Sequence, residues 1–334
     1  SINLASKNLE NKDVLGNAYE YMIKQFADQG GTKGGEFYTP EQVVKTLVGI
    51  VKPKEGEKIY DPTTGSGGML IHSTYYIENH GGNPKNVLLN GQEINLSTWS
   101  ICKMNMLFHD ATGAVIKKGD TIREPKHTKG GVLETFDVVL ANPPFSLKNW
   151  GIDEAKADAY GRFVYGIPPK SYGDLAFVEH MIASLNSKGR MATVLPHGVL
   201  FRGSSEGKIR TAILKDDLIE AVIGLPQNIF YGTGIPAAIL VINKDKSEDR
   251  KGKVLFIDAS QGFVKDGNKN KLRDEDIEKI VSTFDAFERV EKYAEVVSLE
   301  DIENNDYNLN ISRYVDTTEE EEEVDIDKVI GEIR

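Results

Sequence analysis

The chain has 334 residues, 40% hydrophobic and 27% charged, and a net charge of −11, the reverse of the basic excess expected for a stand-alone nucleic-acid binder. No run approaches the roughly 20 apolar residues of a membrane-spanning helix, no basic-then-apolar signal opens the sequence, and the single cysteine, Cys102, excludes a disulfide framework and a thiolate metal cluster. These features predict a cytoplasmic protein with a large core, no membrane association and no metal site.

The acidic charge is concentrated near the C-terminus. Segment 299–327 has twelve acidic residues and one basic residue, Arg313, and therefore carries the whole net charge. Its run of glutamates at 319–323 is interpreted as a solvated linker. The rest of the chain is neutral, so a DNA substrate would need a partner to supply much of the phosphate contact.

The first predicted element is an amphipathic helix at residues 13–29, followed by a glycine-rich polar stretch. Thr39 and Pro40 then resemble an N-cap and a first helical position, and predict a second helix over residues 41–51. Backbone N–H groups at such a helix start can bind a carboxylate, although a capped helix without a ligand explains the same residues.

A strand at residues 58–60 ends in Asp61, and a glycine-rich turn at 65–68 leads from it into an apolar helix. A strand, a glycine-rich turn and a helix together form a cradle for a nucleotide-like ligand. The dinucleotide fingerprint needs a third glycine where this chain has Leu70, and the Gly-Lys-Ser/Thr of a phosphate loop is missing. The turn therefore favours an adenosyl ligand without a phosphate.

Two further strands are predicted to end close to acidic residues. Glu93 follows the strand at 87–91, where an acid can accept both hydroxyls of a ribose. Asp120 follows the strand at 114–118 and can accept from an adenine amino group. Simpler explanations are a solvated strand-end residue for the first acid and a common Gly-Asp turn for the second.

An apolar run at residues 136–141 indicates a fourth, buried strand, which two prolines stop directly after Asn142. Ligands of open α/β sheets bind at the carboxyl ends of such strands. The Asn142 side-chain oxygen and the Pro143 carbonyl oxygen can accept from the N–H groups of a nucleobase amine and localise its lone pair, while Phe145 stacks on the base. A proline-rich loop with a buried aromatic residue is the alternative.

Two polar stretches follow that strand. Residues 146–172 suit a substrate clamp or, equally well, a solvated loop, because they carry Lys148, Trp150, Arg162, Tyr165 and Lys170. The basic stretch at 202–210 is a candidate for phosphate contacts.

A fifth strand is predicted at 190–195, a sixth at 218–225 and a seventh at 237–243. The dozen residues between the last two imply an antiparallel return at the edge of the sheet. Phe230 and Tyr231 in this connection can supply a second wall for a base, or simply anchor a long hairpin.

Three regions are expected: an N-terminal helix and linker at 1–35, a catalytic domain at 36–260, and a C-terminal helical and acidic extension at 261–334. The catalytic domain ends with a small extra strand at 254–257, and the extension starts with a charged helix at 274–293.

Taken in this order, the motifs resemble the modification subunits of type I restriction enzymes, which are adenine-N6 DNA methyltransferases. The resemblance covers roughly residues 13–315 and is strongest in residues 35–40, 61–68, 91–95, 142–145 and 225–236. It implies a Rossmann-like α/β fold, the S-adenosylmethionine-dependent methyltransferase fold, with a seven-stranded, mostly parallel sheet and one antiparallel strand.

The resemblance also implies that S-adenosylmethionine is bound by residues 36–41, the glycine-rich turn and Glu93. With Asp120 added, the predicted cofactor site consists of Glu36, Phe37, Tyr38, Thr39, Pro40, Glu41, Asp61, Gly65, Ser66, Gly67, Gly68, Glu93 and Asp120. The target adenine of DNA would be received by Asn142, Pro143, Pro144 and Phe145.

Family members act with a specificity subunit that reads the DNA target, with a second modification subunit and with a restriction subunit. They carry an N-terminal helical domain before this region, which we expect this sequence to lack. Two alternatives stay open: the same tetrapeptide serves methylation of RNA amines or protein glutamine amides, and the chain can instead be a non-catalytic assembly module.

Overall fold

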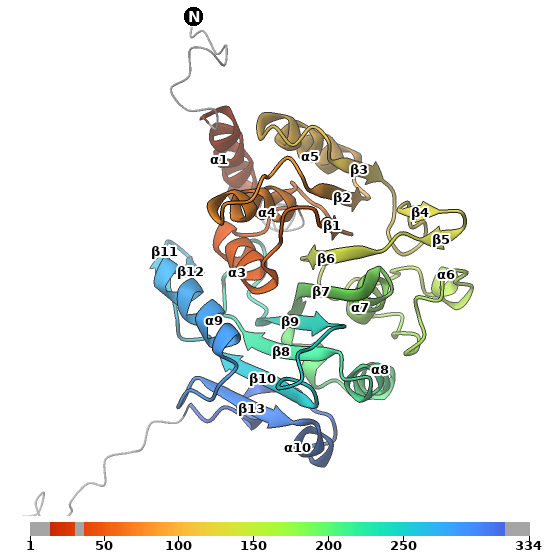
Figure 1. The fold of residues 1–334 in the computed structure, drawn as a ribbon, viewed down its shortest axis with the longest axis vertical. Coiled ribbons are helices and arrows are strands. Elements are labelled where there is room, and N and C mark those ends of the chain that lie inside the picture. The colour runs from red at the N-terminus through yellow and green to blue at the C-terminus, as the bar shows by residue number, and fades with distance from the viewer. Residues whose placement is uncertain (1–13, 31–36, 318–334) are drawn as a thin grey trace, which may run out of the picture.

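A nine-stranded sheet forms the centre of the protein, in a computed structural model that describes residues 14–30 and 37–317 (Figure 1). The strand order is β13-β10-β8-β9-β7-β6-β1-β2-β3. The bounds of these strands in chain order are β1 Lys58–Asp61, β2 Leu88–Glu93, β3 Val115–Lys118, β6 Phe136–Ala141, β7 Leu185–Pro196, β8 Ile219–Gly224, β9 Ala237–Asn243, β10 Lys253–Asp258 and β13 Ala294–Ser298.

The central strands are buried on both faces, which explains their continuous apolar runs. Every residue of β8 is buried, and so are all residues of β9 except its last. The pairs β1·β2, β1·β6, β2·β3, β6·β7 and β8·β10 are parallel. The predicted fold, a mostly parallel α/β sheet of the methyltransferase type, agrees with this arrangement.

The structure differs from the prediction in the number of strands and in the place of the antiparallel strand. The expected seven strands become nine, because the extra strand predicted at 254–257 joins the sheet as β10 and β13 adds a second antiparallel strand beside it. The expected antiparallel pairing of the sixth and seventh strands is confirmed by β8 and β9, but its place at the sheet edge is wrong, since β9 lies between β7 and β8 and is antiparallel to both. In that position the backbone of β9 is hydrogen-bonded along both of its sides, which an edge strand cannot achieve.

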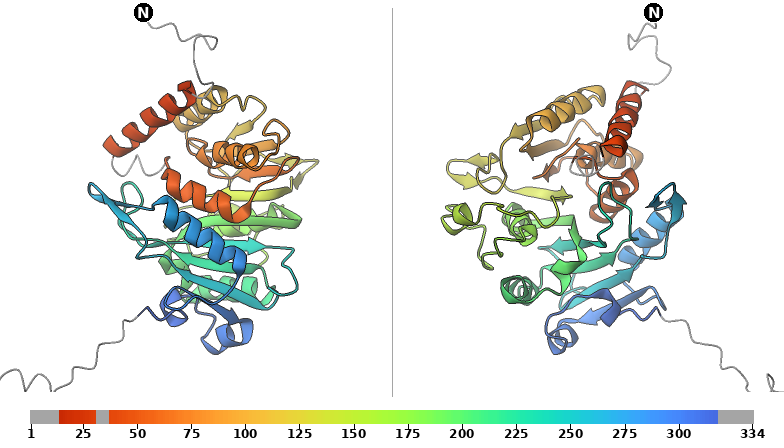
Figure 2. Two further views of the ribbon diagram at one scale, coloured as in Figure 1. Left: turned by 60° about the vertical axis from the view of Figure 1, so that its left-hand side comes forward. Right: turned by 180° about the vertical axis from the view of Figure 1, so that it is seen from behind.

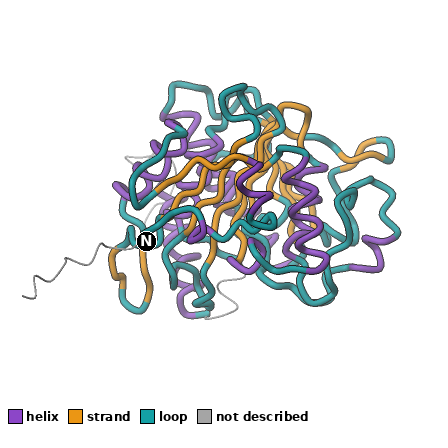
Figure 3. Tube along the Cα trace, turned by 90° about the horizontal axis from the view of Figure 1, so that it is seen from below, coloured by secondary structure: helices purple, strands orange, loops and turns teal. Residues whose placement is uncertain are grey.

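Helices cover both faces of the sheet, so the molecule has three layers (Figures 2 and 3). One apolar cluster joins α3, α4, α5 and α9 to one face, and a second joins α7, α8 and the C-terminal turns to the other. The helices are α1 Val14–Gln29, α3 Glu41–Val51, α4 Gly68–Asn79, α5 Leu96–Phe108, α6 Ile152–Lys156, α7 Asp174–Ala183, α8 Ser204–Lys215, α9 Asp274–Ala286 and α10 Leu299–Asn304, with 3-10 turns η2 His197–Leu200 and η3 Ile311–Arg313.

Several small elements were not predicted. Two hairpins are formed by β4 Thr128–Lys129 with β5 Val132–Leu133 and by β11 Val264–Asp266 with β12 Lys269–Lys271. The charged helix is shorter than predicted, because α9 ends where Phe287 takes the left-handed conformation with φ 51°, and the chain then forms β13. The glutamate run at 319–323 lies outside the described residues. None of the helices within the described part of the chain is long and apolar enough to cross a membrane.

The strand order brings the predicted site residues together. β1 is hydrogen-bonded to β2 on one side and to β6 on the other, all three parallel. Chain order reverses between β1 and β6, and ligands of open α/β sheets bind at such a switch point. Asp61, Glu93 and Asn142 therefore stand at the carboxyl ends of three adjacent strands.

Candidate functional site

The glycine loop, residues 62–67, passes so close to other segments of the same chain that two of its positions require glycine. Gly65 and Gly67 have φ of 56° and 89°, and a Cβ atom on Gly65 would stand 2.6 Å from the carbonyl oxygen of Phe37. The N–H of Ser66 donates to that same carbonyl at 3.0 Å. Two predicted cofactor motifs, separated in sequence, are therefore in direct contact.

Two buried carboxyl groups lie beside this loop. Asp61 accepts the N–H of Thr63 at 2.9 Å, and burial, with a smaller effect of the Glu93 charge, raises the pKa of Asp61 to about 8. Glu93 accepts the N–H of Gly65 at 3.0 Å and that of Asn95 at 2.8 Å, while burial raises its pKa too. A carboxyl group with a pKa near 8 ionises readily when a cation binds beside it.

Asp120 lies apart from these contacts, beyond the edge strand β3. Its carboxylate accepts the N–H groups of Ile122 at 2.9 Å and Arg123 at 3.0 Å, and it forms an ion pair of 2.7 Å with the Arg123 guanidinium. The side chain shapes a turn, and its predicted contact with an adenine stays a prediction.

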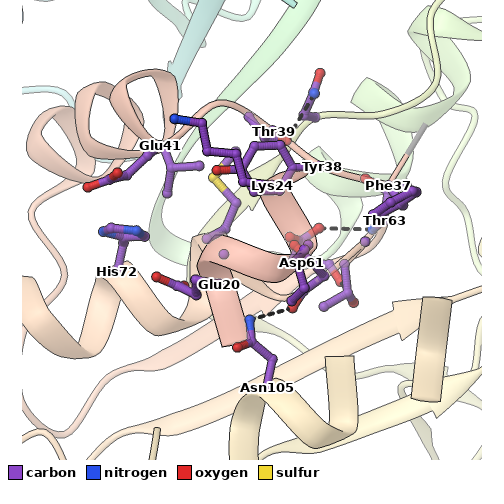
Figure 4. Close-up of a pocket in the computed structure, with 18 of the residues that line it drawn as sticks. Glu20, Lys24, Phe37, Tyr38, Thr39, Glu41, Asp61, Thr63, His72 and Asn105 are labelled. Atoms are coloured by element: carbon purple, nitrogen blue, oxygen red, sulfur yellow. Dashed lines mark hydrogen bonds between the residues drawn. The ribbon is translucent and has the colours of Figure 1, made fainter. Parts of the chain in front are cut away.

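A cleft with a volume of about 280 Å³ opens between the glycine loop, α1 and the start of α3 (Figure 4). Nine predicted site residues line it: Phe37, Tyr38, Thr39, Glu41, Asp61, Gly65, Ser66, Gly68 and Asn142. Predicted residues that do not line it are Pro40, Gly67, Glu93, Asp120, Pro143, Pro144 and Phe145. Glu36 lies outside the described residues.

One wall of the cleft was not predicted, because it comes from α1. Asn17, Glu20 and Lys24 line the cleft, and their spacing of three and four residues puts them on one helical face. Burial, together with the nearby charge of Glu41, raises the pKa of Glu20 to about 7, while burial lowers the pKa of His72 to about 4. Figure 4 shows Glu20, Glu41 and His72 gathered at one end of the cleft. The helical spacing of these polar residues indicates a polar face in the sequence, but it does not show which surface that face contacts.

Three lining residues bring buried oxygen atoms that have no hydrogen-bond partner among the described residues. These are Oγ1 of Thr63, Oδ1 of Asn105 and Oδ1 of Asn142. The Nδ2 group of Asn105 is occupied, since it donates to the Ser66 carbonyl at 3.0 Å. Unpartnered buried polar atoms are rare in folded proteins, and each costs about 1–3 kcal/mol. Their gathering in one cleft points to a ligand that donates hydrogen bonds.

The strand-end motif after β6 combines polar and aromatic contacts. The Nδ2 group of Asn142 donates to Oγ1 of Thr39 at 3.0 Å. Pro143 is buried, and the half-buried Phe145 meets Phe230 edge to face with ring centroids 5.6 Å apart. Phe145 thus packs on Phe230, which is buried in the core, and Asn142 alone of this motif lines the cleft, so the aromatic wall for a base stays a prediction.

Thr39 does not cap α3 as predicted. Pro40 occupies the N-cap position, with φ −54° and ψ 134°, and no side chain caps the helix. The predicted N-cap at Thr39 is wrong because its hydroxyl group bonds Asn142 instead.

Tyr231 occupies a different place from Phe230. Its ring meets Tyr38 at 5.5 Å between centroids, and Nζ of Lys269 lies 3.0 Å from the centre of the Tyr231 ring. Tyr231 therefore supports a residue that lines the cleft.

Basic residues predicted to contact phosphates are used inside the protein. Arg202 pairs with Asp174 at 3.0 Å and Glu206 at 2.6 Å, and Asp174 in turn accepts the N–H of Ser146 at 2.7 Å, directly after the strand-end motif. Arg210 donates to three backbone carbonyls. The guanidinium groups of Arg202 and Arg210 are therefore occupied by buried acids and backbone carbonyls, and the phosphate contacts of the stretch 202–210 stay a prediction.

Two of the five residues named for the predicted substrate clamp in 146–172 are also used inside the protein, and the clamp itself stays a prediction. Trp150 is 1% exposed and Arg162 is 3% exposed. The Arg162 guanidinium pairs with Asp158 at 2.7 Å and donates to two backbone carbonyls. Both side chains hold this segment onto the sheet and do not reach outward.

The chain matches the N-6 DNA Methylase family model over residues 10–323. It is also 39% identical, over 96% of its length, to the type I restriction enzyme MjaVII methylase subunit of Methanocaldococcus jannaschii. The chain belongs to the N-6 DNA methylase family. All nine strands of the sheet fall within the matched region.

Two further proteins are similar to this chain. The HindI methylase subunit of Haemophilus influenzae is 37% identical over 93% of this chain and 70% of its own length. The structure of a type I restriction-modification methyltransferase subunit from Streptococcus thermophilus has a TM-score of 0.84 and 42% identity, with 92% of this chain and 64% of that one covered. This chain spans 56% of the MjaVII subunit.

Proposed function

We propose that the chain is the catalytic part of an S-adenosylmethionine-dependent adenine-N6 DNA methyltransferase, the modification subunit of a cytoplasmic type I restriction-modification system. Family membership and the relatives' names support this reaction. The observation that carries it is Asn142, which stands at the switch point of the sheet, with a buried and unpartnered Oδ1 atom on the wall of a ligand cleft.

The residues of the cleft fit this cofactor. A sulfonium and an ammonium group bring positive charge and N–H donors, which match Asp61, Glu20 and the unpartnered oxygens of Thr63 and Asn105. Gly65 and the other residues of its loop allow close backbone approach, and Glu93 and Asp120 follow on the next two strands for the ribose and the adenine. When bound, S-adenosylmethionine supplies a methyl group that is already activated for transfer to a nitrogen.

Asn142 would polarise the acceptor. The target adenine must leave the duplex, because its N6 atom cannot otherwise reach a buried methyl donor. Oδ1 of Asn142 accepts one N6 hydrogen and so localises the nitrogen lone pair without a charged base. Phe145, already packed on Phe230, offers a ring for the extruded base. Much of the rate would come from this positioning.

DNA binding would depend on partners. Apart from its acidic C-terminal segment the chain is neutral, and Arg202 and Arg210 are occupied internally. A specificity subunit and a second modification subunit would therefore supply the target reading and much of the phosphate contact, with a restriction subunit joining for cleavage.

The test compares Asn142→Ala with Asn105→Ala in the assembled modification complex. We expect Asn142→Ala to keep its affinity for S-adenosylmethionine but to lose methyl transfer by roughly 100-fold or more, the usual cost of removing one polarising group. Asn105→Ala, which removes another unpartnered oxygen of the same cleft, should weaken cofactor affinity instead. The readouts are calorimetric titration and labelled methyl incorporation into DNA, RNA and protein.

Normal methylation by Asn142→Ala would refute the role of Asn142. Label found in RNA or protein would move the reaction to another acceptor. No transfer by the wild-type complex would identify the chain as an assembly module.

A further inference from the structure

The residue before Pro40 has a hydroxyl group that its own helix does not use. Pro40 is the N-cap of α3, and the carbonyl of Pro40 accepts the first helical N–H groups, from Val43 at 3.0 Å and Val44 at 3.1 Å. Thr39 therefore stands outside the helix, and its Oγ1 accepts from Nδ2 of Asn142 at 3.0 Å, across 103 positions of sequence. This bond joins the segment before α3 to the tip of β6.

That bond holds the plane of the Asn142 amide, with Nδ2 toward Thr39 and Oδ1 toward the cleft. A threonine hydroxyl group can accept or donate, so it restrains rotation of the amide. Within the described residues Oδ1 has no partner, and in this plane it can accept from an adenine amine.

From these contacts we infer that Thr39 is a positioning residue for the transfer step, acting through Asn142. The inference rests on the proposed function, because Oδ1 of Asn142 is the group that would polarise the acceptor amine. Thr39 also lines the cleft, so the sequence assigned it only to cofactor binding. Its hydroxyl group carries a second task, which is to hold the Asn142 amide in place for the incoming base.

The matched variants are Thr39→Val, Thr39→Ser and Thr46→Val. Valine has the shape of threonine without the hydroxyl group, and serine restores that group. Thr46 lies on α3 and does not line the cleft, and its Oγ1 donates to the Gln42 carbonyl at 2.8 Å, so Thr46→Val removes a hydroxyl group that does not bond Asn142. The complete modification complex is used, with kcat for adenine methylation and calorimetric Kd for S-adenosylhomocysteine as readouts.

Thr39→Val should lower kcat about tenfold, since one hydrogen bond of ordinary net strength holds the amide in its productive orientation. Its Kd should stay within about threefold of wild type, and Thr39→Ser should recover most of kcat. Thr46→Val should leave kcat unchanged. In an Asn142→Ala background, Thr39→Val should cause no further loss of rate. An unchanged kcat, or a loss of affinity as large as the loss of kcat, overturns the positioning role.

A readout independent of catalysis separates this inference from the proposed function. Selective ¹⁵N labelling of asparagine shows the Asn142 side-chain amide, which is assigned by its disappearance in Asn142→Ala. Thr39→Val should shift this resonance pair and speed its exchange with water, whereas Thr46→Val should not. If the wild-type complex methylates no DNA, the proposed function fails, while the resonances still decide whether Thr39 holds Asn142. An unperturbed resonance pair in Thr39→Val excludes the bond.

Discussion

The buried carboxyl group of Asp61 predicts that cofactor binding depends steeply on pH. In the free protein burial raises the pKa of Asp61 to about 8, so the group is largely protonated at neutral pH. A cationic ligand stabilises the ionised form, and its binding therefore releases a proton. Because protons compete with the ligand, affinity should fall as pH falls, and Asp61→Asn should lose most of this dependence.

The size of the effect follows from the fraction of ionised Asp61. With a pKa near 8, about half of the free protein is ionised at pH 8 and about 1% at pH 6, so affinity should drop about 50-fold between these values. Glu20, whose pKa is raised to about 7, would add a further factor of about 10 over the same range if it also faces the cation. Asp61→Asn should leave only that smaller dependence.

The assay is calorimetric titration with S-adenosylhomocysteine, which keeps the ammonium group, at several pH values and in two buffers of different ionisation enthalpy. The difference between buffers counts released protons. Methylthioadenosine, which lacks the ammonium group, serves as a control for any direct effect of pH on the cleft. If wild type binds S-adenosylhomocysteine with equal affinity at pH 6 and pH 8 and releases no proton, Asp61 does not face the cationic end of the ligand and this reasoning is refuted.

Two further predictions concern packing around the site. Gly65→Ala and Gly81→Ala both place a side chain at positive φ, 56° and 80° respectively. The Cβ atom added at Gly65 would stand 2.6 Å from the Phe37 carbonyl oxygen, whereas no atom of the described residues lies within 4 Å of one added at Gly81. Urea unfolding should show a loss of about 1–2 kcal/mol for Gly81→Ala and about 1–3 kcal/mol more for Gly65→Ala, and equal losses would contradict the contact. Burial raises the pKa of the Cys102 thiol, so a thiol reagent should label it in urea but not in the folded protein; rapid labelling without urea would show that the site opens.

The sequence was most informative where a buried strand meets a residue that stops it. A proline directly follows both Asp61 and Asn142 and stops the strand before it. The carboxyl ends of parallel strands lie on one edge of a sheet, so the closeness of these two residues could be predicted. The contribution of α1 could not, because Glu20 reaches the cleft through packing between segments that sequence spacing does not relate. The helical period of α1 was clear, but the surface that its polar face contacts is determined by tertiary packing.

The internal use of basic residues could not be predicted for a related reason. Arg162 and Arg210 belong to a residue type that is usually exposed, and nothing local shows that backbone carbonyls will satisfy their guanidinium groups. The end of α9 was equally hidden, since Phe287 takes a left-handed conformation that favours glycine. The position of β9 depends on which strands pair with it on its two sides, β7 and β8, and chain order alone does not determine this.

The charges of the cleft help to choose among ligands that contain adenosine. Glu20 and Glu41 line it against Lys24, Asp61 ionises when a cation binds beside it, and burial keeps His72 neutral by lowering its pKa to about 4. A triphosphate would bring several negative charges to this surface, and it would find unpartnered acceptors where it needs donors. A sulfonium ligand with an ammonium group reverses both mismatches. The missing phosphate signature of the glycine loop and the acidic cleft therefore both fit the ligand that we propose, an adenosyl group that carries positive charge.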